Sequence, residues 1–459
     1  MPKLSQYSIV IEKDASYSSL AAAKFLANNI SAATGYQIPV YTDDLPAKDF
    51  EIVVGQTNRE ELSDVCFERS EAREYEYEIR LVGTRLFMSG LGKVGEKIAR
   101  PFNSYVSFSD GAIGTSLAAY RFVEETFGAG FLFPADLSLI TDMDADKIEI
   151  DGRYDFKYTR EDLYGERPEI ADGAVMYSIP VMGSHRRFGN SAIFKASDGS
   201  FAVYNGGLEA DAEHICDLLE YLNADKTQKP RVSAWLISLP MFGYSGALKA
   251  ICEDEALKER ISVDRVYYKV LSENFHTKGS ATARTEHGEY RNALLFAGES
   301  LGCEMLEVNT GDVIKAGDIE FEVLYSPTEE TESAPRVHYF DASVVYKAKF
   351  ADMSVVLFGN ARKRVSDYIL SNGPEKFDCD VLVLSNHGKG GIARECYERI
   401  KAKKYMYQCC PAQYYGDNGE GFASDGGSIT RTRNYLSELG ISCGDICKDT
   451  YGIITFGNK

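Results

Sequence analysis

The sequence is poor in the residues that hold metal ions and disulfide frameworks together. Its 459 residues include six histidines, and no two of them lie within four positions of each other. Zinc sites usually contain histidine or cysteine ligands that lie close together in the sequence. The spacing of the histidines gives this chain no local motif of that kind. The ten cysteines are too few and too scattered for a disulfide framework, and we expect most of them to be reduced and buried.

The chain also lacks an apolar run long enough to span a bilayer. Its N-terminus passes directly into the strand-like Ile9-Val10-Ile11 without the apolar stretch of a signal peptide. We therefore expect a cytoplasmic protein with no membrane contact. The formal net charge of −19 repels phosphate backbones, so we do not expect nucleic acid as a partner.

The chain is too long for one ordinary core, and its pattern changes near residue 152. Residues 1–152 predict a small α+β sandwich with two helices on one face of a sheet. The expected helices are 18–34, which Gly35 ends, and 114–127. The expected strands are 9–11 and 50–54, followed by a hairpin at 75–89 that turns at Gly83-Thr84.

Three segments give this region a resemblance to a known accessory domain. They are Ala-Thr-Gly-Tyr-Gln-Ile-Pro-Val at 33–40, Ile-Val-Val-Gly-Gln-Thr at 52–57 and Ala-Tyr-Arg-Phe-Val-Glu-Glu-Thr-Phe-Gly at 119–128. The region resembles the non-catalytic N-terminal domain of β-hexosaminidases and α-glucuronidases. That resemblance implies an accessory module beside a carbohydrate-active one, without catalytic residues of its own.

Gly90-Leu91-Gly92-Lys93-Val94-Gly95 has the glycine spacing of a dinucleotide-binding loop. Such a loop must open a helix, whereas the sequence that follows contains Pro101 and an alternating, strand-like segment at 105–108. We interpret the motif as a glycine-rich loop and expect no cofactor. Residues 153–189, which include His185, are polar and poorly periodic. They therefore predict a linker or extension.

Residues 190–459 alternate strands with helices after an opening hairpin, which predicts two sheets between helical layers. The segment Trp235–Leu248 resembles the signature of the metallo-β-lactamase superfamily, in which a buried strand enters His-x-His-x-Asp-His. The resemblance extends to Asn190–Gly207, Gly311–Leu324, Val355–Ala361 and Val381–Gly388. It is greatest to the branch that includes competence-type DNA-uptake proteins, and it implies an αββα four-layer domain.

The resemblance also implies a metal site whose ligands have been replaced. The four ligand positions of the signature carry Leu239, Met241, Gly243 and Tyr244. Asn205 and Asn360 stand where the family has aspartate, and Asn386 stands where it has the first histidine of His-His-Gly. Only His387 remains, and one imidazole with a few amides cannot hold a catalytic zinc. We therefore predict a pseudoenzyme without a metal or other cofactor.

Three hypotheses about its role stay open. In the first, a pocket binds a small anionic or carbohydrate-related ligand through Asn205, Asn360, Arg362 and Lys389, since Arg362 stands at an expected helix start. In the second, the chain is a divergent hydrolase that uses His387 as a general base with Tyr244, or a non-standard metal site.

In the third hypothesis the chain is an interaction module with a protein partner. Its aromatic clusters at 267–268, 405–407 and 414–415 would suit a partner or a sugar, although aromatic residues on strands commonly pack in a core. The sequence determines neither the identity of the ligand nor the oligomeric state.

Overall fold

The computed structural model describes residues 1–70, 73, 76–92, 114–128, 143–181, 189–276, 281–334, 337–409, 428–441, 446–448 and 452–457. The chain divides into two compact units. One comprises Met1–Gly165 with Pro411–Cys443, and the other comprises Glu166–Cys410 with Gly444–Lys459. The change of unit after Gly165 falls inside the stretch 153–189. His185, Gly95 and the aromatic pair at 414–415 lie outside the described residues.

The first unit is built on a six-stranded mixed sheet in the order β2-β1-β3-β5-β4-β6. Strands β2, β1, β3 and β5 run parallel, while β4 is antiparallel to both β5 and β6. The strands are β1 (Ser8–Ile11), β2 (Val40–Thr42), β3 (Glu51–Val54), β4 (Tyr77–Val82), β5 (Arg85–Gly90) and β6 (Phe156–Tyr158). The predicted hairpin at 75–89 is confirmed as β4 and β5.

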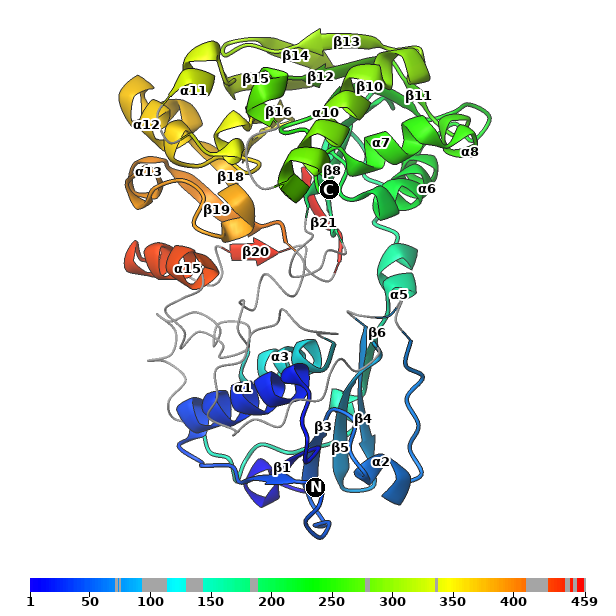
Figure 1. Cartoon of the computed structure of the whole chain (residues 1–459), viewed down its shortest axis with the longest axis vertical. Coiled ribbons are helices and arrows are strands. Elements are labelled where there is room, and N and C mark those ends of the chain that lie inside the picture. Colours follow the sequence, from blue (N-terminus) through cyan, green and yellow to red (C-terminus); the bar gives the residue numbers. More distant parts are fainter. Residues whose placement is uncertain are drawn as a thin grey trace. The chain divides into compact units, whose positions relative to one another are not determined.

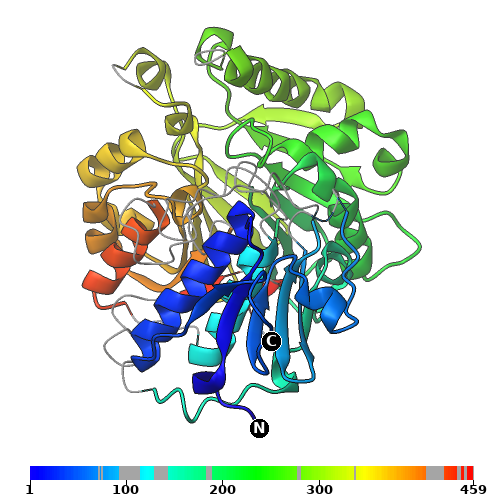
Figure 2. The same cartoon turned by 60° about the horizontal axis from the view of Figure 1, so that its bottom comes forward.

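Two helices, α1 (Tyr17–Thr34) and α3 (Gly114–Phe127), lie side by side on this sheet (Figures 1 and 2). The Ser16 hydroxyl caps α1 by accepting from the Ser19 N–H at 3.2 Å, and Gly35 ends it with φ 71°. The rings of Phe25 and Tyr120 meet at 4.3 Å between the helices. The predicted α+β sandwich is thus confirmed. The unit also contains α2 (Arg59–Leu62), α5 (Arg160–Gly165) and α15 (Ser428–Glu438).

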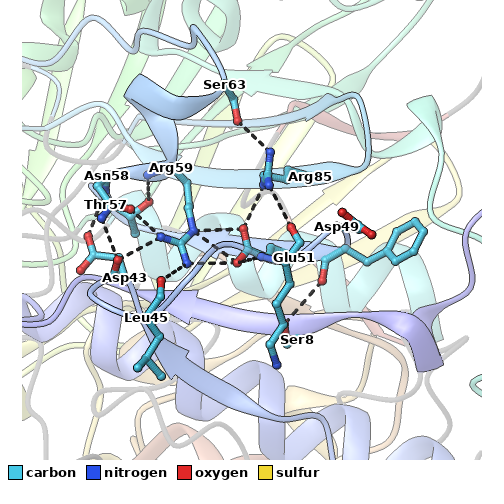
Figure 3. A network of polar contacts seen from close by, with 12 residues as sticks. Ser8, Asp43, Leu45, Asp49, Glu51, Thr57, Asn58, Arg59, Ser63 and Arg85 are labelled. Carbon is cyan, nitrogen blue, oxygen red and sulfur yellow. Dashed lines mark hydrogen bonds and ion pairs between the residues drawn. The ribbon is translucent and has the colours of Figure 1, made fainter.

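A buried ionic network fixes the loop that precedes β3 (Figure 3). The Glu51 carboxylate accepts from the Arg59 guanidinium at 3.1 Å and from Arg85 at 2.9 Å. Arg59 also donates to the carbonyl groups of Asp43 and Leu45. Buried charges of this kind are tolerated only when paired and hydrogen-bonded, so the network has a structural role.

The second unit contains two mixed sheets, the first with eight strands in the order β13-β12-β10-β9-β8-β7-β21 and β11 beside β10. Its strands are β7 (Val175–Ile179), β8 (Ser191–Lys195), β9 (Phe201–Asn205), β10 (Arg231–Leu236), β11 (Ser262–Val263), β12 (Arg265–Tyr268), β13 (Glu304–Glu307) and β21 (Ile454–Gly457). The other sheet has seven strands in the order β14-β15-β16-β17-β18-β19-β20. These are β14 (Val313–Ala316), β15 (Ile319–Tyr325), β16 (Val345–Phe350), β17 (Met353–Leu357), β18 (Cys379–Val383), β19 (Ala402–Tyr407) and β20 (Ile446–Lys448).

The two sheets pack face to face around one apolar core. Phe194 of β8 meets Phe321 of β15 edge to face at 5.0 Å between ring centres. Helices α6 (Ala212–Leu222), α7 (Gly246–Glu253) and α10 (Ala281–Leu301) pack on the outer face of the first sheet (Figure 1). Helices α12 (Lys363–Asn372) and α13 (Arg394–Arg399) lie beside the second sheet. The predicted αββα four-layer class is therefore confirmed.

The described part of this unit also contains the short helices α8 (Glu255–Lys258), α9 (Glu273–His276) and α11 (Glu329–Ser333), and a 3-10 turn at Tyr339–Ala342. Several elements had no counterpart in the sequence prediction, among them β7 and α10. Strand β7 is wholly buried, and the described side chains of α10 include only a narrow buried stripe at Tyr290, Leu294 and Ala297.

Candidate functional site

The candidate residues lie in loops that follow the carboxyl ends of four strands. Asn205 ends β9, Tyr244 lies between β10 and α7, Asn360 between β17 and α12, and His387 just after β18. Strands β9 and β10 are parallel neighbours in one sheet, and β17 and β18 are parallel neighbours in the other. In α/β folds, loops at the carboxyl ends of parallel strands are the usual position of binding sites.

Three of these residues form one buried hydrogen-bonded cluster. The Tyr244 hydroxyl lies 2.7 Å from His387 Nε2 and donates to Asn360 Oδ1. Tyr244 and Asn360 are fully buried, and His387 is 1% exposed. Burial raises the pKa of Tyr244 well above its usual value of 10, so the side chain is a neutral phenol at physiological pH.

His387 is held in one tautomer by its other ring nitrogen. Nδ1 lies 2.9 Å from the Gln408 carbonyl oxygen, which can only accept, so Nδ1 carries the hydrogen. Burial, together with a smaller effect of the Lys389 charge, lowers the pKa of His387 to about 4. At neutral pH its Nε2 is therefore a bare acceptor facing Tyr244.

The backbone around His387 is unusual. Asn386, His387 and Gly388 have φ values of 51°, 58° and 77°, in the left-handed region. For a residue such as histidine this conformation costs roughly 1–2 kcal/mol. The Asn386 N–H donates to the Gly359 carbonyl at 2.7 Å, and a Cβ on Gly388 would lie 2.2 Å from the Tyr407 ring. Packing from neighbouring strands thus maintains the turn that points His387 inward.

Asn205 has a different role in the structure. Its Oδ1 accepts from the Ser238 N–H at 2.9 Å, its amide donates to Asn190, and its backbone carbonyl accepts from the Trp235 indole. With φ 57° it also adopts the left-handed region, which asparagine tolerates well. These contacts join β9 to the loop after β10, and none of them reaches Tyr244 or His387.

The remaining positions of the loop are apolar and packed. Leu239, Met241 and Tyr244 belong to a buried cluster with Leu271, Phe275, Tyr290 and Ala342. Asn360 Nδ2 lies 4.0 Å from Met241 Sδ. Gly243 contributes its carbonyl oxygen to the Asn190 N–H at 3.1 Å. Side chains therefore fill the interior around the cluster.

These residues do not fit a zinc ion. Zinc takes anionic thiolate or carboxylate ligands and neutral imidazoles, whereas this cluster offers one imidazole, a neutral phenol, an amide and a thioether. Among the residues that the structure describes, no group of three or more histidine, cysteine, aspartate or glutamate side chains could hold a metal ion. Leu239 and Gly243 have no side-chain donor at all.

The predicted helix start at Arg362 is confirmed, since Arg362 is the residue before α12. A carboxylate of the protein itself already accepts a hydrogen bond from a backbone N–H group at this helix start. Asp341, which is 2% exposed, accepts from the Arg364 N–H at 3.0 Å and from the His338 N–H at 2.9 Å. Lys363 pairs with Asp367 at 3.0 Å. Lys389 lies two residues beyond His387 and is only partly exposed.

Two residues of the site were missed from the sequence. Gln408 anchors His387 and donates its amide to the Ser191 carbonyl at 2.6 Å and to Ser178 at 2.9 Å. Asp341 caps α12. The one signal for Gln408 is its place as the first polar residue after a buried strand, and Asp341 has no comparable signal.

No protein-family model and no curated protein sequence matches this chain. Among solved structures, it is similar to the metallo-β-lactamase fold protein YhfI from Bacillus subtilis, at 11% identity and a TM-score of 0.35, over 62% of this chain and 100% of that one. It is also similar to CmlA, a diiron β-hydroxylase from Streptomyces venezuelae, at 11% identity and a TM-score of 0.35. That match covers 76% of this chain and 61% of CmlA.

A metallo-β-lactamase from Cronobacter sakazakii is similar at 12% identity and a TM-score of 0.30, over 60% of this chain and 96% of that one. Likeness at this level assigns no activity to the chain. Within the described parts of the chain, no helix combines the length and apolar character that a bilayer crossing requires.

Proposed function

We propose that this chain is a pseudoenzyme whose second unit binds a small anionic or carbohydrate-related ligand without metal-assisted hydrolysis. The observation that supports this most is the buried cluster of Tyr244, His387 and Asn360. A metal-dependent hydrolase needs several anionic or imidazole ligands that converge on an ion and lower the pKa of its bound water. Here a neutral phenol occupies the centre of the cluster, and apolar side chains surround it.

In this proposal the cluster of Tyr244, Asn360 and His387, which we call the strand-end cluster, has a structural role. The Tyr244 hydroxyl and the Gln408 carbonyl both contact the His387 ring, and these contacts connect the loops after β10, β18 and β19. A site relieved of its metal would otherwise leave buried polar groups without partners, at a cost of roughly 1–3 kcal/mol each. The hydroxyl of Tyr244 donates its one hydrogen to Asn360 Oδ1 and lies within hydrogen-bond distance of His387 Nε2. We propose that the first unit is a non-catalytic accessory module, because its segments at 33–40, 52–57 and 119–128 resemble those of such a module.

The experiment compares turnover by the full chain and by a His387→Ala variant on a panel of phosphoesters, lactones and glycosides. The proposal predicts background rates for both proteins. Turnover that exceeds background and is lost in His387→Ala would instead support a hydrolase that uses His387 as its base. A Lys363→Gln variant serves as control, because Lys363 is exposed and pairs only with Asp367 among the described residues.

A further inference from the structure

A second cluster of rings and charges lies against the loop that carries Tyr244. Its centre is Tyr339, whose hydroxyl donates to the Pro240 carbonyl at 2.6 Å. His287 stacks on the Tyr339 ring at 3.7 Å and an interplanar angle of 7°. Tyr339 and Phe340 also pack on the apolar cluster that contains Leu239 and Met241. The second cluster therefore adjoins the site described above without sharing its polar atoms.

One histidine of this second cluster has a complete set of partners. His276 Nε2 accepts from the Leu271 N–H at 3.1 Å, so Nδ1 carries the hydrogen and can donate to the Tyr339 hydroxyl at 3.1 Å. Burial is the main cause that lowers the pKa of His276 to about 3. His276 is thus a neutral structural residue, and it has no hydrogen left to offer a ligand.

The other two histidines keep unused hydrogen-bonding capacity. Nδ1 of His287 is buried and has no hydrogen-bond partner within the described residues. His338 is exposed, and its Nδ1 accepts from the Phe340 N–H at 3.1 Å, so the neutral ring carries its hydrogen on Nε2. Burial lowers the pKa of His287 to about 4, whereas partial desolvation of its ring and the charge of Arg362 lower the pKa of His338. Both rings can therefore act as neutral N–H donors.

Arg362 supplies the positive charge. Its guanidinium lies over the Phe340 ring at 5.4 Å, and the imidazole of His338 meets the same ring at 4.8 Å. Within the described residues, Arg362 makes no ion pair, although the chain carries a net charge of −19. The carboxylate of Asp341, which follows Phe340 in the chain, already accepts hydrogen bonds from the N–H groups of His338 and Arg364. A planar guanidinium fork without a carboxylate suits a phosphate or carboxylate ligand.

We propose that Arg362 and His338, with His287 beside them, form a binding site for a phosphate monoester on the Tyr339-Phe340 surface. The guanidinium would donate two parallel hydrogen bonds to phosphate oxygens, and His338 Nε2 would donate a third. The aromatic faces would contact the organic part of the ligand. This proposal rests on the proposed function, since it names the class of anion that the second unit would bind.

Isothermal titration of the full chain with glucose 6-phosphate tests the proposal, with glucose and inorganic phosphate as comparison probes. We expect saturable binding of glucose 6-phosphate, weaker binding of phosphate and none of glucose. Arg362→Gln should weaken binding by roughly 10-fold or more, because the free energy of a charge-assisted hydrogen bond corresponds to a change in affinity of that size. Arg362→Lys, which keeps the charge but loses the fork, should weaken it less.

Lys363→Gln is the matched control, because Lys363 adjoins Arg362 in the chain but is exposed and pairs with Asp367. The proposal is overturned if glucose 6-phosphate does not bind, if glucose binds equally well, or if Arg362→Gln binds like the control. Should Arg362→Gln fail to fold, Arg362→Lys and His338→Gln decide the outcome by the same comparison. Failure here with background turnover refutes only the phosphate site, whereas turnover lost in His387→Ala refutes the proposed function.

Discussion

The hydroxyl of Tyr244 has one hydrogen and two acceptors, Asn360 Oδ1 and His387 Nε2. Because Nδ1 of His387 uses the imidazole hydrogen on Gln408, the neutral ring has none to return to Tyr244. Protonation of His387 would complete the chain of hydrogen bonds, but burial opposes the charged form. The cluster therefore stays uncharged and depends on one hydroxyl.

Removal of that hydroxyl is the first test at the residue scale. Tyr244→Phe keeps the ring but leaves two buried polar groups with one partner fewer, so we expect the free energy of unfolding to fall by about 2 kcal/mol. Urea denaturation measures the change. Tyr346→Phe is the control, since the Tyr346 phenol is equally buried but makes a single 3.4 Å hydrogen bond to Ile237. Equal losses in the two variants would contradict the role given to Tyr244.

The depressed pKa of His387 predicts a pH dependence of stability. The unfolded chain protonates this histidine near pH 6.5, whereas the folded chain does so only near pH 4, so the unfolded state binds more protons between these values. Stability is therefore complete above pH 6.5 and falls by about 3 kcal/mol from this group as the pH drops toward 4.

Urea denaturation from pH 7 to pH 4.5 measures this slope in the wild type and in His387→Asn. The slope should be smaller in the variant, while His276 and His287, whose pKa values burial also lowers, maintain part of it in both proteins. Identical slopes would show that His387 does not titrate as described.

At the scale of elements, local signals predicted what local chemistry determines. Gly35 ends α1 as predicted, and Gly83-Thr84 forms the predicted turn between β4 and β5. Helix α10 was missed because a mostly polar helix with a narrow buried stripe has weak periodicity. The left-handed turn at Asn386-His387 could not be predicted either, because tertiary packing against Gly359 and Tyr407 maintains it.

The candidate residues also differ in whether the sequence or only the tertiary packing determines their contacts. The resemblance to the metallo-β-lactamase signature implied that Tyr244, Asn360 and His387 belong to one site, and the structure brings these three together. Asn205 and Arg362 lie outside that cluster, because their side chains contact Ser238 and Phe340 instead. Which residue fills a neighbour's hydrogen-bonding capacity depends on distances that no sequence pattern contains.

The network before β3 gives a prediction for an element. Arg59→Met leaves Glu51 buried with Arg85 as its remaining ionic partner, so we expect a loss of about 3–5 kcal/mol of unfolding free energy. Arg153→Met is the control, since Arg153 and Asp151 form a largely exposed pair that should contribute at most about 1 kcal/mol. Thermal unfolding followed by circular dichroism compares the two. Similar losses would show that the network does not stabilise the first unit.

The whole molecule combines an αββα unit with a smaller α+β unit, and we propose that it binds a ligand without hydrolysing it. Arg362, which makes no ion pair with any described residue and lies beside two histidines, contrasts with the chain's net charge of −19. That contrast favours a specific anion over general electrostatic attraction, because the overall field repels anions. Binding of glucose 6-phosphate should therefore weaken only modestly between low and moderate salt, and a steep loss would contradict a built site.

We propose that the cluster of Tyr244, Asn360 and His387 holds no catalytic metal. The most direct measurement is elemental analysis of the full chain and of His387→Ala, both produced with added zinc and purified without chelator. We expect the same substoichiometric zinc content in the two proteins, because the cluster offers a single imidazole with no anionic ligand. Stoichiometric zinc in the wild type that is absent from His387→Ala would contradict it.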